Sequence, residues 1–219
     1  MRNFCASMRL GLVTDIHSHH AELCRALELF RLHDVEKIVT IGDTCDVFRS
    51  PKGADRVAAQ LAACGAVGVW GNHDFSLCRD VSEASGTRYD VTTLNFMEQM
   101  QPRLEIEGCY FSHKDASVDP CDAGQLWTYE DDTLDLTARA RAGLAAVPNA
   151  RQFVGHYHRW WAATEDGPID WSGAEPLTLR PGRRYFVIVA AVFQGHCAVF
   201  DTVSGLLEPL HCGLPKSED

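Results

Sequence analysis

Short clusters of potential metal-binding side chains occur at five places along the chain, each directly after a stretch of apolar residues. The clusters combine carboxylates, imidazoles and one amide, and they are Asp15/His17, Asp43/Asp46, Asn72/His73, His113 and His156/His158. Mixed oxygen and nitrogen donors suit Mn, Fe, Zn or Ni better than Mg or Ca, which favour oxygen ligands. The clusters therefore predict a site for transition-metal cations.

The spacing inside two of these clusters favours chelation. Asp15 and His17 are two residues apart, and residues i and i+2 of an extended segment lie on the same face, so both side chains are expected to bind one cation. His156 and His158 have the same spacing. A turn at that point would direct the two imidazoles to different metals, so both arrangements remain open for this pair.

The elements that must position the clusters alternate between strands and helices in the first third of the chain. Apolar runs and helical spacing predict strands over 9–14, 37–41 and 66–70, with helices over 21–32 and around 57–64. Consecutive βαβ units form a parallel sheet covered by helices. Because the carboxyl ends of parallel strands face one edge, we expect the clusters to converge there.

The remainder of the chain is less regular, and we expect all of it to belong to one domain over residues 8–212, with tails at 1–7 and 213–219. A helix is predicted over 91–100, two strands with a turn at Glu107-Gly108 over 104–112, a surface loop over 115–132, a helix over 133–146 after Asp131-Asp132, and a strand over 151–154. The last quarter predicts antiparallel strands over 177–179, 185–191, 197–201 and 206–210, which would complete a second sheet.

Composition excludes several classes of protein. Hydrophobic residues make up 46% of the chain, but no stretch reaches the roughly 18 apolar residues that a membrane span requires. Residues 1–7 lack the apolar region of a secretory signal, so we expect a cytoplasmic protein, with Met8 as an alternative start. The net charge of −10 disfavours nucleic acid as a partner. Nine scattered cysteines without a CxxC pair predict reduced thiols.

Five ordered motifs in this sequence resemble those of the calcineurin-like metallophosphoesterases. They are Asp15-Ile-His17, Gly42-Asp43-Thr-Cys-Asp46, Gly71-Asn72-His73-Asp74, a single His113, and Gly155-His156-Tyr-His158. The resemblance implies two mixed β-sheets packed face to face, flanked by helices, with a dinuclear metal site at the carboxyl ends of the strands. It also implies metal-dependent hydrolysis of a phosphoester.

The resemblance assigns a role to each motif position. It implies metal ligands at Asp15, His17 and His158 for the first cation, at Asn72, His113 and His156 for the second, and at Asp43 as a bridge between them. His73 would be the catalytic histidine, oriented by Asp46. Two cations would activate a bridging hydroxide that attacks phosphorus in line, and His73 would protonate the leaving oxygen, a contribution of about 10²–10⁴ in rate. Manganese is the cation expected to support activity in vitro.

The same comparison narrows the substrate. Val47-Phe48 stands where Ser/Thr protein phosphatases carry Arg-Gly, and Asp74 stands where they carry Glu, so a phosphoprotein substrate is disfavoured. The short chain favours small phosphodiesters or nucleotides, with a small phosphomonoester as the alternative. A non-catalytic interaction module is a further alternative, which the presence of His73 and every ligand type disfavours. The sequence predicts a small phosphorylated partner and no membrane, and it does not determine the oligomeric state.

Several residues beside the motifs have two interpretations. His113 is either a ligand or a surface histidine, and Lys114 either adds positive charge for a phosphate or is solvated. Arg159 either contacts the substrate phosphate or forms a surface salt bridge. The choice between stacking on a base or sugar and packing in the core applies to Tyr157, Trp160 and Trp161.

Overall fold

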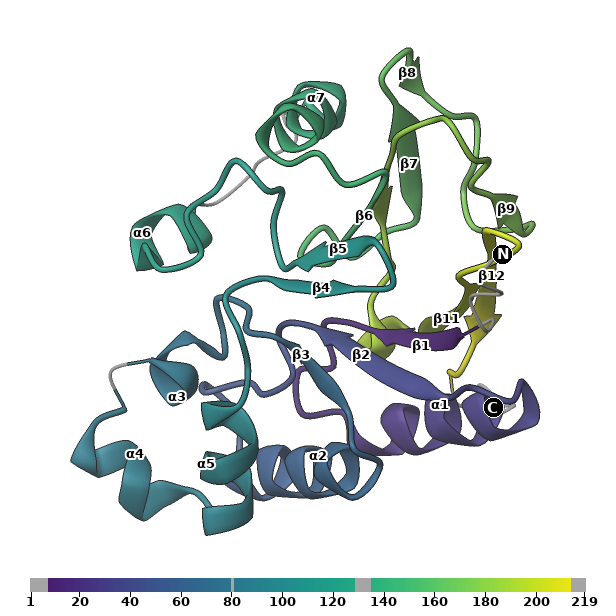
Figure 1. Cartoon of the computed structure of the whole chain (residues 1–219). Helices are drawn as coiled ribbons and strands as arrows, with labels where there is room; N and C mark the ends of the chain where they lie inside the picture. The colour runs from purple at the N-terminus through teal and green to yellow at the C-terminus, as the bar shows by residue number, and fades with distance from the viewer. Residues whose placement is uncertain (1–7, 80, 129–134, 214–219) are drawn as a thin grey trace, which may run out of the picture.

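Two mixed β-sheets of six strands each lie face to face, with helices on their outer sides (Figure 1). The computed structural model describes residues 8–79, 81–128 and 135–213. The predicted tails, apart from residue 213, and the predicted helix start at Asp131-Asp132 lie outside the described residues. The arrangement confirms the predicted two-sheet α/β fold. Within the described residues, no helix is long and apolar enough to cross a membrane.

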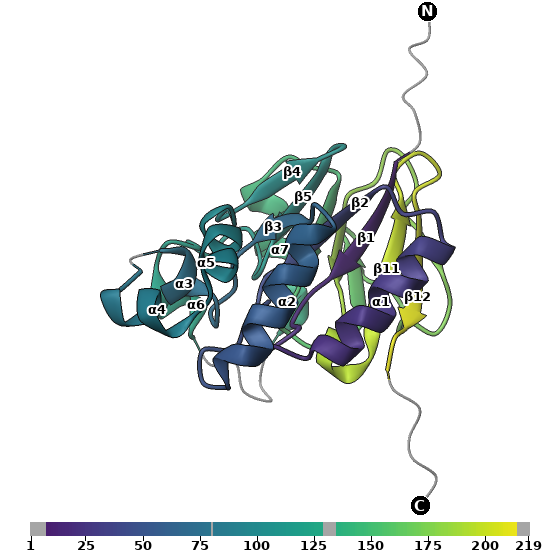
Figure 2. The same ribbon diagram turned by 90° about the horizontal axis from the view of Figure 1, so that it is seen from below.

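The first sheet contains the three parallel strands that the sequence predicts. They are β1 (Arg9–Val13), β2 (Lys37–Ile41) and β3 (Val67–Val69), and they are connected through α1 (His20–Leu32) and α2 (Pro51–Ala63). Figure 2 shows α1 and α2 lying along the same face of this sheet. Leu23, Leu27 and Phe30 of α1 are buried at helical spacing, which explains why this helix packs on the sheet.

The C-terminal strands are divided between the two sheets, so the prediction that they complete the second sheet is correct for one of the four and wrong for the other three. Three of them extend the first sheet from the free edge of β1, namely β11 (His196–Asp201), β12 (Leu206–His211) and β9 (Leu177–Thr178). The fourth, β10 (Tyr185–Ile188), lies inside the second sheet. Alternating hydrophobicity identifies a strand but not its partner, which is why the sequence misplaced them.

The second sheet is built around β10, which pairs in parallel with β6 (Arg151–Val154) and antiparallel with β7 (Trp161–Thr164). The remaining strands are β4 (Leu104–Ile106), β5 (Cys109–Ser112) and the short β8 (Gly167–Pro168). The turn between β4 and β5 lies at Glu107 and Gly108, as predicted, and both residues have positive φ. The sequence did not predict β7 and β8.

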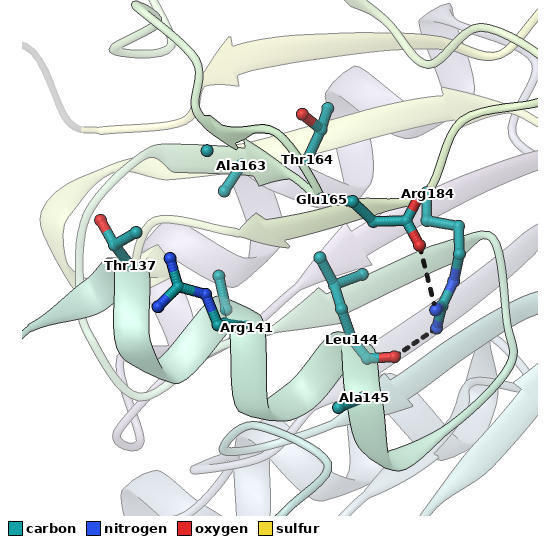
Figure 3. Close-up of a pocket in the computed structure, with 10 residues that line it drawn as sticks. Thr137, Arg141, Leu144, Ala145, Ala163, Thr164, Glu165 and Arg184 are labelled. Carbon is teal, nitrogen blue, oxygen red and sulfur yellow. Dashed lines mark hydrogen bonds and ion pairs between the residues drawn. The ribbon is translucent and has the colours of Figure 1, made fainter.

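Helix α7 (Leu136–Ala146) covers the outer face of the second sheet, and Asp135 caps it by accepting a hydrogen bond from the Ala138 N–H. A hollow of about 200 Å³ lies between α7 and β7, and Figure 3 shows the side chains that line it. Arg184 lies in it and donates to the Leu144 and Val147 carbonyls and to Glu165. Its guanidinium therefore binds carbonyl groups at the carboxyl-terminal end of α7, where a positive charge is favourable.

Large apolar side chains fill the space between the sheets. Phe111 and Phe153 of the second sheet stack with ring centroids 5.5 Å apart, and Phe200 of the first sheet lies 5.0 Å from Phe153. All three are fully buried. Burying one such side chain stabilises the fold by roughly 1.5–3 kcal/mol. This core fixes the two sheets relative to each other, and with them the strand ends that carry the polar clusters.

Three short helices follow β3 at the side of the first sheet. They are α3 (Phe75–Cys78), α4 (Glu83–Arg88) and α5 (Val91–Glu98). The last of these confirms the predicted helix and ends two residues earlier than expected. Phe96 and Met97 of α5 are buried in the core cluster that also contains α1 and α2.

Candidate metal centre

All five polar clusters meet at one place, the carboxyl ends of five strands. Asp15 and His17 follow β1, Asp43 and Asp46 follow β2, and Asn72 and His73 follow β3, all in the first sheet. The other three side chains, His113, His156 and His158, follow β5 and β6 of the second sheet. The two sheets therefore contribute opposite walls of one site, as the parallel strand order predicts.

The predicted ligands form a continuous network of close donor atoms. His158 Nε2 lies 3.1 Å from Asp15 Oδ1, and Asp43 Oδ2 lies 3.2 Å from His113 Nε2 and 3.7 Å from His17 Nε2. The Asn72 side-chain oxygen lies 3.1 Å from both His113 Nε2 and His156 Nδ1. Asp43 thus lies between the two halves of the network, where a bridging ligand is expected.

The donor set fits divalent cations. Within 4.8 Å of one another lie ligand atoms of Asp15, His17 and His158, and also those of Asp15, Asp43 and His113. Two carboxylates, Asp15 and Asp43, are buried here, which is costly unless positive charge accompanies them. His17 Nε2 is buried and has no hydrogen-bond partner, the state expected of a nitrogen whose lone pair is reserved for a cation.

The pKa values of His113 and His156 shift in opposite directions in this site. Burial lowers the pKa of His113, but the Asp43 and Asp15 carboxylates and the Ile41 carbonyl together outweigh that effect, and the pKa rises to about 9. Burial lowers the pKa of His156 to about 3, with help from His113 and Lys114. A metal ligand must be deprotonated, so a cation that binds at His113 must displace a proton there, whereas His156 is already neutral.

A hydrogen bond to the backbone fixes the orientation of the His113 ring. Its Nδ1 lies 2.8 Å from the Ile41 carbonyl, which is the arrangement of a ring that donates from Nδ1 and presents Nε2 to a metal. His113 is also fully buried, so the interpretation of this residue as a surface histidine is wrong.

The backbone at the ligand positions is strained. Five predicted ligands, Asp15, His17, Asp43, His156 and His158, have φ values of 49°, 46°, 49°, 67° and 52°. Such conformations cost on the order of 1–3 kcal/mol each and persist only where the surroundings enforce them. The Asp15 and His17 N–H groups donate to the Gly42 and Asp43 carbonyls, which holds the two loops in this conformation.

The backbone conformation of Asp15 and His17 differs from the extended one that the sequence analysis predicted. The two residues lie beyond the end of β1 and are left-handed, so the expected extended segment is wrong. Both side chains nevertheless reach the site, where Asp15 Oδ1 lies 3.1 Å from His158 Nε2 and His17 Nε2 lies 3.7 Å from Asp43 Oδ2. Close backbone contact adds to this constraint, because a Cβ at Gly71 would collide with the Asp43 carboxylate and a Cβ at Gly155 with Thr14.

His73 and Asp46 form a pair at the rim of the network. His73 Nδ1 lies 3.3 Å from Asp46 Oδ1, and the other carboxylate oxygen of Asp46 lies 3.1 Å from Arg49 Nε. The His73 backbone N–H donates to Asp43 Oδ1 at 2.9 Å, which ties the histidine to the predicted bridging carboxylate. Ligand atoms of Asp46, His73 and His17 also lie within 4.8 Å of one another, so distance alone would permit a cation there too.

Asp74, the last residue of the third motif, stabilises the loops that carry the proposed ligands. This role was not predicted from the sequence. The buried Asp74 carboxylate accepts hydrogen bonds from the backbone N–H groups of Thr44, Cys45 and Gly71. Burial and the nearby Asp43 raise its pKa to about 7, against the effect of these three donors. It thereby links the second motif to the third.

The segment after His113 is not the simple surface loop that was predicted. It contains α6 (Ala123–Leu126), and Leu126 is buried in the core. Lys114 is also buried and donates to the Gln125 and Thr128 carbonyls, so the interpretation of this lysine as a solvated residue is wrong. Its positive charge nevertheless acts on the site, because it helps to lower the pKa of His156. Pro and Gly residues favoured a loop, while the buried side chains could be recognised only in three dimensions.

A cavity of about 330 Å³ opens above the network between α6 and the loop after β6. It is lined by Asp43, Asn72, His73, Leu126, Trp127, Thr128, His156, Tyr157, His158 and Arg159. Arg159 therefore faces the site, whereas Trp160 packs edge-on against Trp171 and Tyr157 is buried. Two aromatic residues that the sequence did not assign to the site, Trp127 and Phe48, flank His73.

Comparison with known proteins agrees with this geometry. A model of the calcineurin-like phosphoesterase superfamily domain matches residues 8–203. A metallophosphoesterase from Sphaerobacter thermophilus has a similar structure, with a TM-score of 0.73, 18% identity, and coverage of 94% of this chain and 88% of that chain.

Two further solved structures share the fold. A hypothetical protein from Pyrococcus horikoshii aligns with a TM-score of 0.57 and 11% identity, covering 95% of this chain and 89% of that chain. A structure described as an archaeal phosphodiesterase aligns with a TM-score of 0.52 and 14% identity, covering 93% and 99%. No curated protein matches the chain in sequence.

Proposed function

This chain belongs to the calcineurin-like phosphoesterase superfamily, and from that premise we propose that it hydrolyses small phosphodiesters or nucleotides with two divalent cations. The observation that carries the proposal is the convergence of carboxylate, imidazole and amide donors from both sheets around Asp43, with the His73–Asp46 pair beside them. A purely structural metal site would have no use for that pair.

We assign the cations to the seven predicted ligands. Asp15, His17 and His158 would hold the first, Asn72, His113 and His156 would hold the second, and Asp43 would serve both. When bound, two such cations clamp phosphoryl oxygens and neutralise the charge that develops in the transition state. The mixed donors favour Mn, Fe, Zn or Ni, and manganese is the cation we would add in vitro.

His73 acts in this proposal as the general acid and not as a ligand. Its Nδ1 faces Asp46, so the imidazole can carry a proton on Nε2 toward the cavity that it lines. Asp46 accepts from Nδ1 and stabilises the imidazolium. Arg49 occupies the other oxygen of the Asp46 carboxylate, which favours an orienting role over metal binding for this residue.

A diester is favoured over a monoester by the charges around the cavity. A monoester dianion carries one more negative charge than a diester and needs additional cationic donors. Among the described residues that line the cavity, Arg159 is the one Lys or Arg. Lys114 lies close by but donates to backbone carbonyls of the α6 segment.

We expect the manganese-loaded protein to hydrolyse bis-p-nitrophenyl phosphate with a kcat/KM at least about tenfold above that for p-nitrophenyl phosphate, a difference of about 1.4 kcal/mol in transition-state stabilisation. Steady-state release of p-nitrophenol measures both values. A preference for the monoester would reverse the substrate class and leave the metal chemistry intact. If the protein hydrolyses neither ester, the result would favour the alternative that it is a non-catalytic interaction module.

The cysteines and the net charge of the chain support a proposed location and a proposed partner. The eight described cysteines are free thiols, which supports a reducing, cytoplasmic location. The partner we propose is a small phosphorylated molecule, and the net charge of −10 opposes binding of a long nucleic acid.

A further inference from the structure

Two exposed aromatic rings stand together at the mouth of the site. Phe48 is 74% exposed and Trp127 is 42% exposed, and they are the aromatic members of the exposed large hydrophobic residues in the described part of the chain. Their ring centroids lie 5.9 Å apart, and both rings contact the His73 ring, at 5.6 Å and 4.8 Å. Single exposed apolar residues are common, whereas a contiguous aromatic patch beside a reactive group points to a ligand.

The Phe48 backbone is tied to the proposed catalytic pair by a hydrogen bond. The Phe48 backbone N–H donates to Asp46 Oδ1 at 3.0 Å, the same oxygen that faces His73 Nδ1. A shared acceptor therefore sets the position of both the histidine and the phenylalanine.

Trp127 is held from the opposite side of the site. It follows α6, and its N–H donates to the Ala123 carbonyl. Lys114, the residue after the proposed ligand His113, donates to the carbonyls of Gln125 and Thr128, one on each side of this tryptophan segment. A buried lysine thus holds the backbone that carries Trp127 beside the proposed ligand His113.

The two rings lie on the side of the site from which the leaving group departs. If His73 protonates the leaving oxygen, the substituent on that oxygen extends past His73, where Phe48 and Trp127 stand. His156, His158 and Arg159 also line the cavity, and these side chains suit charged oxygens.

We propose that Phe48 and Trp127 bind a planar aromatic ring carried by the leaving alcohol, so that the substrate is a nucleotide-type phosphoester. The proposal rests on the function proposed above, because it uses His73 to define the leaving side. The Phe48 and Trp127 rings contact each other, so the ligand ring stacks on the free face of the indole with Phe48 as a side wall. Such stacking is sequence-tolerant and changes affinity by about 10–100-fold.

Adenosine 5′-monophosphate and ribose 5-phosphate provide a matched pair of probes, because they share the phosphate and ester oxygen, and ribose 5-phosphate carries a hydroxyl group where the nucleotide carries its base. Isothermal titration calorimetry on the manganese-loaded protein measures both dissociation constants without relying on turnover. We expect the nucleotide to bind about 10–100-fold more tightly. Trp127→Ala and Phe48→Ala should reduce that ratio to within about threefold of unity, while Trp127→Phe retains part of it.

Leu32→Ala is the matched control, since Leu32 is 78% exposed at the end of α1 and should leave the ratio unchanged. Equal affinities for the two probes, or a ratio that survives both alanine substitutions, would overturn the proposal. Hydrolysis of bis-p-nitrophenyl phosphate by the same samples separates the two hypotheses. Turnover without base preference contradicts the aromatic site alone, and base preference without turnover contradicts the proposed hydrolysis.

Discussion

His73→Ala should keep its bound cations and lose about 10²–10⁴ of the rate on a diester with an alkyl or sugar leaving group. The imidazole lies at the rim, paired with Asp46, and the seven proposed ligands do not include it. Its removal takes away the proton for the leaving oxygen and leaves the metal-binding network in place. Elemental analysis and kcat on the same preparations measure the two effects.

A comparison of two leaving groups makes the test of His73 more specific. p-Nitrophenolate departs with little protonation, so the loss on bis-p-nitrophenyl phosphate should be clearly smaller than on an alkyl diester. His211→Ala, at an exposed position on β12, is the control for loss of an imidazole and should change neither rate. An equal loss on both substrates, or loss of metal from His73→Ala, would assign His73 to the metal site instead.

Asp43→Asn should lower the metal content from two cations to fewer than one per chain and reduce the rate by at least about 10³, the equivalent of several kcal/mol of lost charge stabilisation. Asp43 is buried and its carboxylate lies between His17 and His113, one from each proposed metal site. The amide preserves the shape of the side chain and removes its charge. Elemental analysis and steady-state kinetics measure the two changes.

The matched control for Asp43 is Asp166→Asn, which removes one negative charge from an exposed pair with Arg183 and should retain both metals and full activity. Thermal unfolding of both variants shows whether the fold is preserved. Retention of two tightly bound cations by Asp43→Asn would contradict the bridging role.

Much of the fold and of the site could be predicted from sequence, since local patterns determine both. The run Lys37–Ile41 has the predicted strand limits, and this strand ends directly before the motif that carries Asp43. Parallel βαβ units then require the clusters to meet at one edge, and they do. The metal-ligand roles themselves remain predictions that the experiments above address.

What the sequence could not supply depends on tertiary contacts. The left-handed backbone at Asp15 and His17 is imposed by hydrogen bonds to the Gly42 and Asp43 carbonyls in another loop. The pairing of β11 with β1 joins opposite ends of the chain, which periodicity cannot specify. The exposure of Trp127 beside His73 depends on how α6 packs, and a single tryptophan in a polar segment gave no signal of it.

The most direct test of the dinuclear hydrolase is a titration of the metal-free protein with Mn²⁺, in which bound metal per chain and the rate on bis-p-nitrophenyl phosphate are measured together. We predict that close to two cations bind per chain and that the rate rises to a plateau as the second one binds. Binding of one cation or fewer, or two bound cations without turnover, would contradict the account and favour an interaction module with this fold.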